Sequence, residues 1–292
     1  MFQIISDGGC DFSRAEVASS GVHVVPFYIS LDHENYLKEG IDITREDYFT
    51  QLSTNKNLFP KTSQPNPQDY IDAYTPYLSE GLDILSLSIS SKLSGSHASA
   101  RIAIETLKEE FPTREIILID SQNATLGQGL ILKEIIKMRD AGLSLHEAAA
   151  MAEKVRETTH LYCTLDTLEY LKRGGRVGPT TAFVGSILGL RPILQVKDGA
   201  VSQLDNVAGK KKAFRLIESA MIEALKDNVQ DISICIGHIL NEEDAKTFKQ
   251  NAEAALGVSI ENPVAEIGAT IGTHAGPGAF GFAYCKKYTA IS

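Results

Sequence analysis

Short apolar runs alternate with amphipathic segments along the first half of the chain. The apolar runs have the length and composition of buried strands, and they cover residues 2–6, 22–30, 84–89 and 115–120. The segments between them carry apolar side chains at helical spacing, and they cover residues 13–20, 44–55, 68–78, 98–107, 126–138 and 144–157. This strand–helix–strand order predicts an α/β fold with a mostly parallel sheet.

The second half has a different order of elements. Its strand-like runs cover residues 161–165, 192–196, 200–204, 232–236, 259–267 and 279–286, and its helical segments cover residues 168–172, 182–190, 210–226 and 245–256. The dipeptide Asp198-Gly199 predicts a hairpin turn. We therefore expect a mixed or antiparallel sheet with helices on one face. Since the strand–helix alternation pauses at a helical pair that ends near residue 158, we predict two domains, residues 1–158 and 159–292.

Small polar side chains follow three strands of the first half. Asp7 ends the first strand, a hydroxyl-rich stretch from Ser88 to Ser96 follows the third, and Asp120-Ser121 follows the fourth. The carboxyl ends of parallel strands meet at one edge of a sheet, where open α/β folds bind ligands. Alternatively, Asp7 caps the helix that follows it.

The stretch from Ser88 to Ser96 is the densest of these turns, and it leads directly into a helix. Free backbone N–H groups at a helix start, together with the helix dipole, favour an anion. Ser94 is therefore a candidate ligand-binding hydroxyl, or else a simple helix cap.

The loop at residues 61–67 carries exposed hydroxyls on a stiff backbone. Pro65 and Pro67 restrict the residues before them to extended conformations. Thr62 and Ser63 are thus held in place for polar contacts, because a rigid loop loses little freedom on binding. The alternative is a loop that only caps the following helix.

Two glycine-rich segments of the second half carry candidate site residues. Arg173 and Arg176 frame two glycines and are suited to gripping a phosphate or carboxylate, or else they pair with surface acids. The segment 272–281 contains a formal G-x-G-x-x-G, but only 11 residues follow it, too few for a dinucleotide-binding unit. Its one titratable side chain, His274, lies among glycines that permit close approach of a ligand, so we expect a site residue in a loop.

Charge and cysteine usage exclude several classes of function. A net charge of −9 argues against a nucleic-acid footprint. The four scattered cysteines form no C-x-x-C pair, which is typical of buried thiols in a reducing compartment. We find no signal-peptide pattern and no apolar run of membrane-spanning length, so we expect a cytoplasmic protein. The histidines and cysteines lack the spacing of a metal site.

Taken in order, the motifs resemble the DegV family of bacterial fatty-acid-binding proteins, whose members serve as lipid-carrying subunits of fatty acid kinases. The motifs that carry the resemblance span nearly the whole chain. They are Asp7 after the first strand, Thr62-Ser63-Gln64-Pro65, Ser90 to Ser96, Asp120-Ser121 with Leu126 to Leu130, Tyr170 to Arg176, Pro192-Ile193-Leu194 with Asp198-Gly199, and Gly272 to Gly278.

The resemblance implies two α/β domains with one long-chain fatty acid between them and no cofactor. It assigns the carboxylate to Thr62 and Ser94, with His274 nearby and with Ser63, Gly95 and Ser96 completing the two loops. The acyl chain is then expected in a tunnel of the second domain. For its lining we predict Phe183, Ile187 and Leu188.

The same resemblance implies a kinase partner, which we expect to dock at Arg173 and Arg176. Two departures from the family pattern bear on this. Asn206 to Gly209 stands where a Lys-x-Arg-Thr run is expected, so Ala208 replaces an arginine, although Lys210 to Lys212 follow directly. The opening reads Ser6-Asp7-Gly8-Gly9, without the usual hydroxyls after the aspartate.

The leading hypothesis is therefore a carrier that presents a fatty acid for phosphorylation and performs no chemistry itself. The first alternative is an acyl-ester hydrolase that uses Ser94 and His274 with Asp7 or Asp120. The sequence around Ser94 lacks the G-x-S-x-G nucleophile elbow of such enzymes. A phosphotransferase is disfavoured because there is no P-loop. The other alternative is a lipid sensor without a kinase partner, which the alanine at position 208 would fit.

Overall fold

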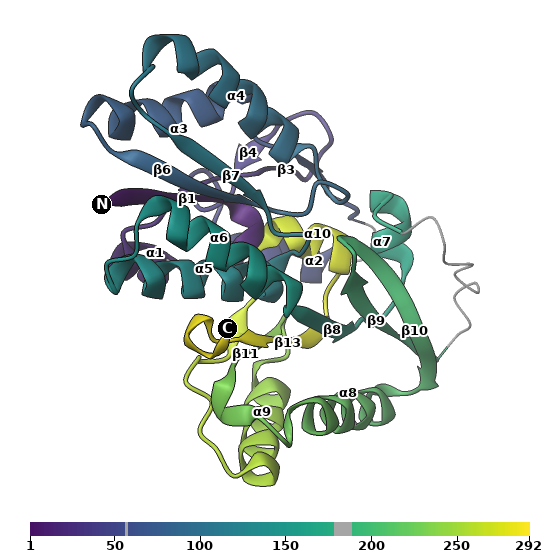
Figure 1. Ribbon diagram of the computed structural model, residues 1–292. Coiled ribbons are helices and arrows are strands. Elements are labelled where there is room, and N and C mark those ends of the chain that lie inside the picture. Colours follow the sequence, from purple (N-terminus) through teal and green to yellow (C-terminus); the bar gives the residue numbers. More distant parts are fainter. Residues whose placement is uncertain (56–57, 178–188) are drawn as a thin grey trace.

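The computed structural model describes residues 1–55, 58–177 and 189–292 (Figure 1). A parallel four-stranded sheet is built from the first half of the chain in the order β2-β1-β6-β7. Its strands are β1 (Phe2–Asp7), β2 (His23–Val25), β6 (Asp83–Ser88) and β7 (Ile116–Asp120). The parallel sheet predicted for this half is confirmed.

Helices cover both faces of the parallel sheet. One face carries α3 (Pro67–Ser79) and α4 (Ser96–Glu110), and the other carries α5 (Thr125–Asp140) and α6 (Leu145–Glu157), as Figure 1 shows. Asn66 caps α3 with a capping box, so the loop at 61–67 does have the capping role considered for it.

A six-stranded mixed sheet forms from the second half in the order β10-β9-β8-β13-β11-β12. Its strands are β8 (His160–Thr164), β9 (Leu190–Lys197), β10 (Ala200–Ala208), β11 (Ile232–His238), β12 (Ala265–Glu266) and β13 (Phe280–Lys286). All of its neighbours pair antiparallel except β11 and β12, so the predicted mixed sheet is confirmed.

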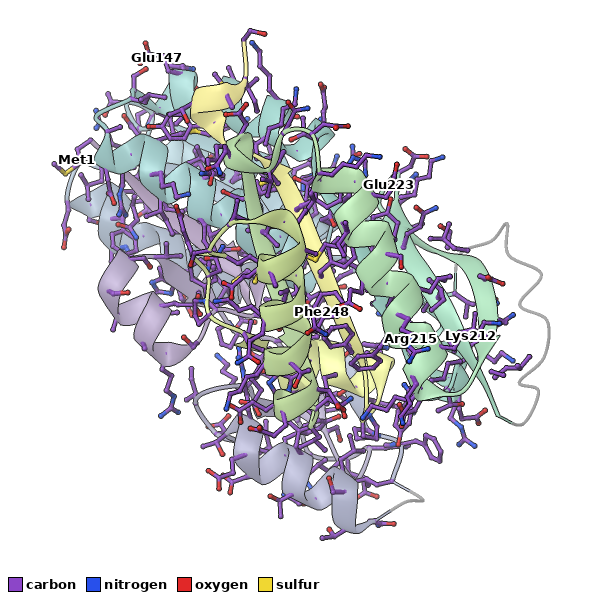
Figure 2. All side chains as sticks on the ribbon, turned by 90° about the horizontal axis from the view of Figure 1, so that it is seen from below. Met1, Glu147, Lys212, Arg215, Glu223 and Phe248 are labelled. Atoms are coloured by element: carbon purple, nitrogen blue, oxygen red, sulfur yellow. The ribbon has the colours of Figure 1, made fainter. Side chains whose placement is uncertain are left out.

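The far face of the mixed sheet is covered by α8 (Lys210–Leu225) and α9 (Glu242–Leu256). Figure 2 views the molecule from this side: Phe248 of α9 lies between helix and sheet, where its ring packs on Phe280 and Phe282. Lys212 and Arg215 extend from the exposed side of α8. Helices therefore cover both faces of this sheet, and the expectation of one covered face is wrong, because α5 and α6 cover the other face.

Helix α5 is the shared layer between the two sheets. It packs on β1 and β6 above and on β8, β11 and β13 below. Since both sides of the helix meet apolar neighbours, buried residues run all the way round it, from Leu126 to Met138. One apolar cluster joins residues on both sides of position 158, and the domain boundary there stays a prediction.

Smaller elements fill the edge of the molecule. A three-stranded antiparallel sheet has the order β4-β3-β5, with β3 (Tyr28–Ser30), β4 (Leu37–Lys38) and β5 (Lys61–Ser63). The remaining elements are η1 (Gly8–Cys10), α1 (Arg14–Ser20), α2 (Arg45–Thr54), α7 (Glu169–Gly174), η2 (Val229–Asp231), α10 (Ala269–Ala275) and η3 (Tyr288–Ala290). In the three described ranges, no helix combines the length and the apolar character needed to cross a membrane.

Three local expectations are wrong. The run 22–30 is two strands in different sheets, separated at Pro26, which has no N–H to donate to a ladder. The run 259–267 forms a strand only at Ala265–Glu266, after Pro263. His274 lies in the last turn of α10 and not in a loop.

A buried carboxylate connects the ends of β1 and β6 to the layer of α5. Asp7 is fully buried and accepts five hydrogen bonds. Its Oδ1 accepts from Gly9 N (3.1 Å) and Gln128 Nε2 (2.9 Å). Its Oδ2 accepts from Ile89 N (3.0 Å), Ser96 Oγ (2.6 Å) and, at 3.5 Å, Tyr70 OH. Burial raises the pKa of this carboxyl, while the donors on Gln128, Ser96, Ile89 and Gly9 favour its charged form. Asp7 does cap the short η1 helix, and it also fixes both ends of the turn that carries Ser94.

Replacing Asp7→Ala is expected to lower the free energy of unfolding by about 3 kcal/mol, because its buried hydrogen-bond donors lose their acceptor. Urea unfolding followed by circular dichroism measures this. The exposed Asp227→Ala is the matched control and should change stability by less than about 0.5 kcal/mol. Equal midpoints for the two variants would show that the turn does not depend on Asp7.

Candidate functional site

Thr62 is positioned by the small antiparallel sheet. Strand β5 pairs with β3, and this places Thr62 opposite Ile29. Its hydroxyl lies 2.8 Å from His274 Nε2, 212 residues away in sequence. Two of the three predicted carboxylate-binding residues are therefore in direct contact.

His274 lies partly buried at the end of α10. Burial, reinforced by the positive charge of Arg176, lowers the pKa of this imidazole to about 4, so the ring is neutral at pH 7. Nε2 bonds to Thr62, while Nδ1 has no partner in the described part of the chain. The ring packs directly on Gly174 of α7, where any side chain would overlap Nδ1, and this explains a glycine at the end of that helix.

Ser94 lies in the turn between β6 and α4. Its Oγ accepts a hydrogen bond from Ser96 N (3.2 Å) within the turn, while the N-cap residue of α4 is Gly95 and no side chain in the described part of the chain caps this helix. The next residue, Gly95, packs against the side-chain amide of Gln64, and a Cβ there would overlap it. Through this contact the turn at Ser94 is held against the loop that carries Thr62.

Arg176 connects these parts. Its guanidinium donates from Nε to Leu93 O (3.1 Å) and from NH1 to Gly174 O (2.6 Å). The first bond reaches the turn of Ser94 and the second reaches α7 beside His274. The sequence suggested Arg176 for gripping a phosphate or carboxylate and for partner docking, and the structure places it next to the predicted carboxylate-binding residues.

An inner cavity of about 110 Å³ opens beside these side chains. Thr62, Gln64, Ser94, Arg176 and His274 form its polar end. Most of its other walls are apolar, and they include Phe27, Ile89, Leu93, Ala124, Leu161, Cys163, Leu165, Leu171, Leu194, Val196, Val201, Ile271 and Ala275. A largely apolar cavity with a cluster of polar side chains in its wall suits an amphipathic chain.

An outer hollow of about 420 Å³ lies on the other side of the same polar residues. It shares Thr62, Arg176 and His274 with the inner cavity. The rest of its lining consists of His33, Phe59, Pro60, Lys61, Tyr170, Arg173, Gly174 and Thr273. Its described lining contains basic side chains and no acidic one. The shared polar residues thus separate a largely apolar cavity from a basic hollow, and this shared wall is called the partition below.

Other predicted residues have different surroundings. Ser63 is exposed, and Ser96 is fully buried, where it donates to Asp7. Arg173 stacks over the ring of Phe59 and pairs with Glu169, so the surface pairing considered for it occurs. Phe183, Ile187 and Leu188 lie outside the described residues. The roles proposed for all of these residues stay predictions.

The cavity walls on β8 and β9 were missed by sequence reasoning. Leu161 and Cys163 of β8, and Leu194 and Val196 of β9, face the cavity at alternate positions of their strands. The sequence does show apolar residues at alternate positions of these strands. It does not show which face of the sheet borders a cavity, because neighbouring elements decide that.

The geometry provides no hydrolytic triad among the described residues. Ser94 Oγ forms no hydrogen bond with His274, whose Nε2 is taken by Thr62. His274 Nδ1 has no carboxylate to orient it there. In the same part of the chain, no group of histidine, cysteine and acidic side chains is arranged to hold a metal ion.

Comparison with known proteins decides the family. The family description "Uncharacterised protein, DegV family" matches residues 1–287. A DegV domain-containing protein of Clostridium perfringens is 32% identical over 98% of this chain and 99% of its own. The chain belongs to the DegV family.

Solved DegV structures share the whole fold. A stearic acid-binding protein from Eubacterium ventriosum superimposes with a TM-score of 0.94 at 28% identity, covering 100% of both chains. A DegV family protein from Thermus thermophilus, described by its fatty acid binding, has a TM-score of 0.86 at 33% identity, covering 98% of this chain and 99% of its own. DegV structures carry fatty acids as ligands, with no cofactor indicated.

The depressed pKa of His274 predicts a pH effect on stability. The unfolded chain binds a proton at this residue below about pH 6.5, whereas the folded protein binds it only near pH 4. Stability contributed by the neutral ring is therefore complete above pH 6.5 and is lost as the pH falls toward 4, by up to about 1.4 kcal/mol per pH unit.

Urea unfolding at pH 7.5 and pH 5.0 checks this for the parent protein and for His274→Gln. The parent should lose more stability between the two pH values than the variant does. Equal losses in both proteins would mean that His274 titrates normally in the folded state.

Proposed function

We propose that this protein binds one long-chain fatty acid, with its carboxylate at Thr62, Ser94 and His274 and its acyl chain in the inner cavity. The observation that carries the proposal is the composition of that cavity: hydroxyl, imidazole and guanidinium groups gather at one end of an otherwise largely apolar chamber. The fatty acids named for related DegV structures support the same ligand class.

Burial of the acyl chain supplies the affinity. Each buried methylene contributes about 0.8 kcal/mol, so a chain of roughly 15 methylenes gains on the order of 12 kcal/mol before ordering costs. The cavity of about 110 Å³ holds only part of a chain of this length as it stands.

Neutral donors suit the carboxylate end. The Thr62 hydroxyl and the Ser94 hydroxyl orient the head group without forming a buried ion pair, which is costly to desolvate. His274 is neutral at pH 7 and so adds a hydrogen-bonding group without charge. Arg176 is already held by two carbonyl oxygens and adds positive potential next to the head group.

The partition between cavity and hollow supports a carrier and not a catalyst. A carboxylate at Thr62 and His274 would have its chain in the cavity and one oxygen toward the basic outer hollow. We infer that a partner kinase docks over this hollow, near Arg173 and Arg176, and phosphorylates the exposed oxygen with ATP. Use of ATP would place the protein in the cytoplasm.

The double variant Thr62→Ala/Ser94→Ala is expected to lose its fatty acid. Without both hydroxyls the carboxylate has fewer donors, and each lost charge-assisted hydrogen bond lowers affinity by about 1.5–3 kcal/mol, roughly 10- to 100-fold. Native mass spectrometry and solvent extraction of the purified proteins measure the bound ligand.

Thr106→Val on the exposed side of α4 is the control and should keep its ligand. A parent protein that is empty and also fails to take up added hexadecanoate would contradict the binding proposal. Labelling of Ser94 by a fluorophosphonate would instead support a hydrolase.

Kinase docking is tested at Arg173, which lines the outer hollow but not the inner cavity. Arg173→Ala should leave hexadecanoate binding unchanged and slow ATP-dependent acyl phosphate formation in an extract of the source organism at least about fivefold. Lys226→Ala, at the far end of α8, is the control. If acyl phosphate forms equally fast with both variants, docking at the hollow is contradicted. If the parent protein supports no acyl phosphate formation, a sensor without a kinase partner is favoured.

A further inference from the structure

Two buried hydroxyls in the wall of the inner cavity have no role in the carboxylate site. Thr125 is 8% exposed and Thr270 is 3% exposed, and both line the cavity. Thr270 Oγ1 has no hydrogen-bond partner in the described part of the chain. The Thr125 hydroxyl accepts no hydrogen bond there and contacts the Asp11 carboxylate, a contact that favours the charged form of Asp11. Buried polar groups of folded proteins are almost always hydrogen-bonded, so the unpaired Thr270 hydroxyl, in one cavity with Thr125, points to a partner that comes from the ligand.

The spacing of Thr270 and His274 on α10 shows how far the Thr270 hydroxyl lies from the carboxylate end of the cavity. Thr270 and His274 lie four residues apart on α10, so both project from the same face of the helix. Four residues rise about 6 Å along a helix axis. The Thr270 hydroxyl is therefore about one helical turn from the imidazole that marks the carboxylate end.

Thr125 contributes from a second element, the first turn of α5. Its φ of +48° is unusual for a β-branched residue. Behind it lies Asp11, whose Oδ1 accepts from Gly268 N (3.0 Å) and whose carboxylate is in contact with the Thr125 hydroxyl. The wall here is thus polar on both sides of Thr125, although Phe27, Ile89 and Ala124 surround it with apolar groups.

We propose that Thr125 and Thr270 form a subsite for a hydroxyl group on the acyl chain, close to the carboxylate, and that the preferred ligand class is a 3-hydroxy fatty acid. The inference rests on the proposed fatty-acid function and names the substrate class of the same cavity. A hydroxyl is both donor and acceptor, so it can satisfy two threonine hydroxyls at once. A plain acyl chain leaves the Thr270 hydroxyl unpaired.

The test compares two ligands on two proteins. Displacement of a fluorescent fatty acid gives the affinities of hexadecanoate and 3-hydroxyhexadecanoate for the parent and for Thr270→Val, which keeps the shape of the side chain and removes its hydroxyl. The parent should bind the hydroxylated acid about five- to tenfold more tightly. We call the affinity for 3-hydroxyhexadecanoate divided by that for hexadecanoate the affinity ratio. The Thr270→Val variant should have an affinity ratio close to one while still binding hexadecanoate.

Two controls fix the location of the effect. Thr106→Val, outside the cavity, should keep the ratio of the parent. The hydroxyl of 12-hydroxyoctadecanoate lies far from the carboxylate. Thr270→Val should therefore leave the affinity for this acid, relative to hexadecanoate, unchanged.

The outcomes separate the two proposals. If neither acid binds the parent, the fatty-acid function itself is wrong. If hexadecanoate binds and the ratio is the same in parent and Thr270→Val, the fatty-acid function stands and the subsite is wrong. A ratio near one in the parent, with tighter hexadecanoate binding by the variant, would mean that only water pairs with these hydroxyls, and it also overturns the subsite.

Discussion

The buried carboxylate of Asp7 is the interaction on which the rest of the site depends. It accepts from Ile89 N and Ser96 Oγ, at the two ends of the turn that carries Ser94, and from Gln128 in the helical layer between the sheets. Desolvating a charge is tolerable only where its lone pairs are satisfied, and here five donors surround it. The turn that carries Ser94 is thereby held at both of its ends.

Helix α10 brings the second half of the chain to this edge. Its first N–H groups donate to Glu39 and Asp11, which come from more than 200 residues earlier in the sequence. Its last turn then places His274 against Thr62, and Gly174 lets α7 pack on the imidazole. Contacts far apart in sequence therefore build the partition between the apolar cavity and the basic hollow.

These long-range contacts also explain what could be predicted from the sequence. Strand ends located the turn at Ser94, because parallel strands align their carboxyl ends. Family resemblance was needed to join it to Thr62 and His274. Helix α10 escaped prediction since it is short, contains Gly272, and takes its N-terminal hydrogen-bond acceptors from distant Asp11 and Glu39. The walls on β8 and β9 show a clear period of two, but the sequence does not reveal which face borders a cavity.

A crystal structure of the protein with hexadecanoate tests the central claim most directly. The account predicts electron density for the carboxylate within hydrogen-bonding distance of Thr62 Oγ1 and Ser94 Oγ, with the chain extending between the cavity faces of β8 and β9. Density for the methyl end at Thr62, or for a ligand only in the large groove beside α1 and β12, would contradict it.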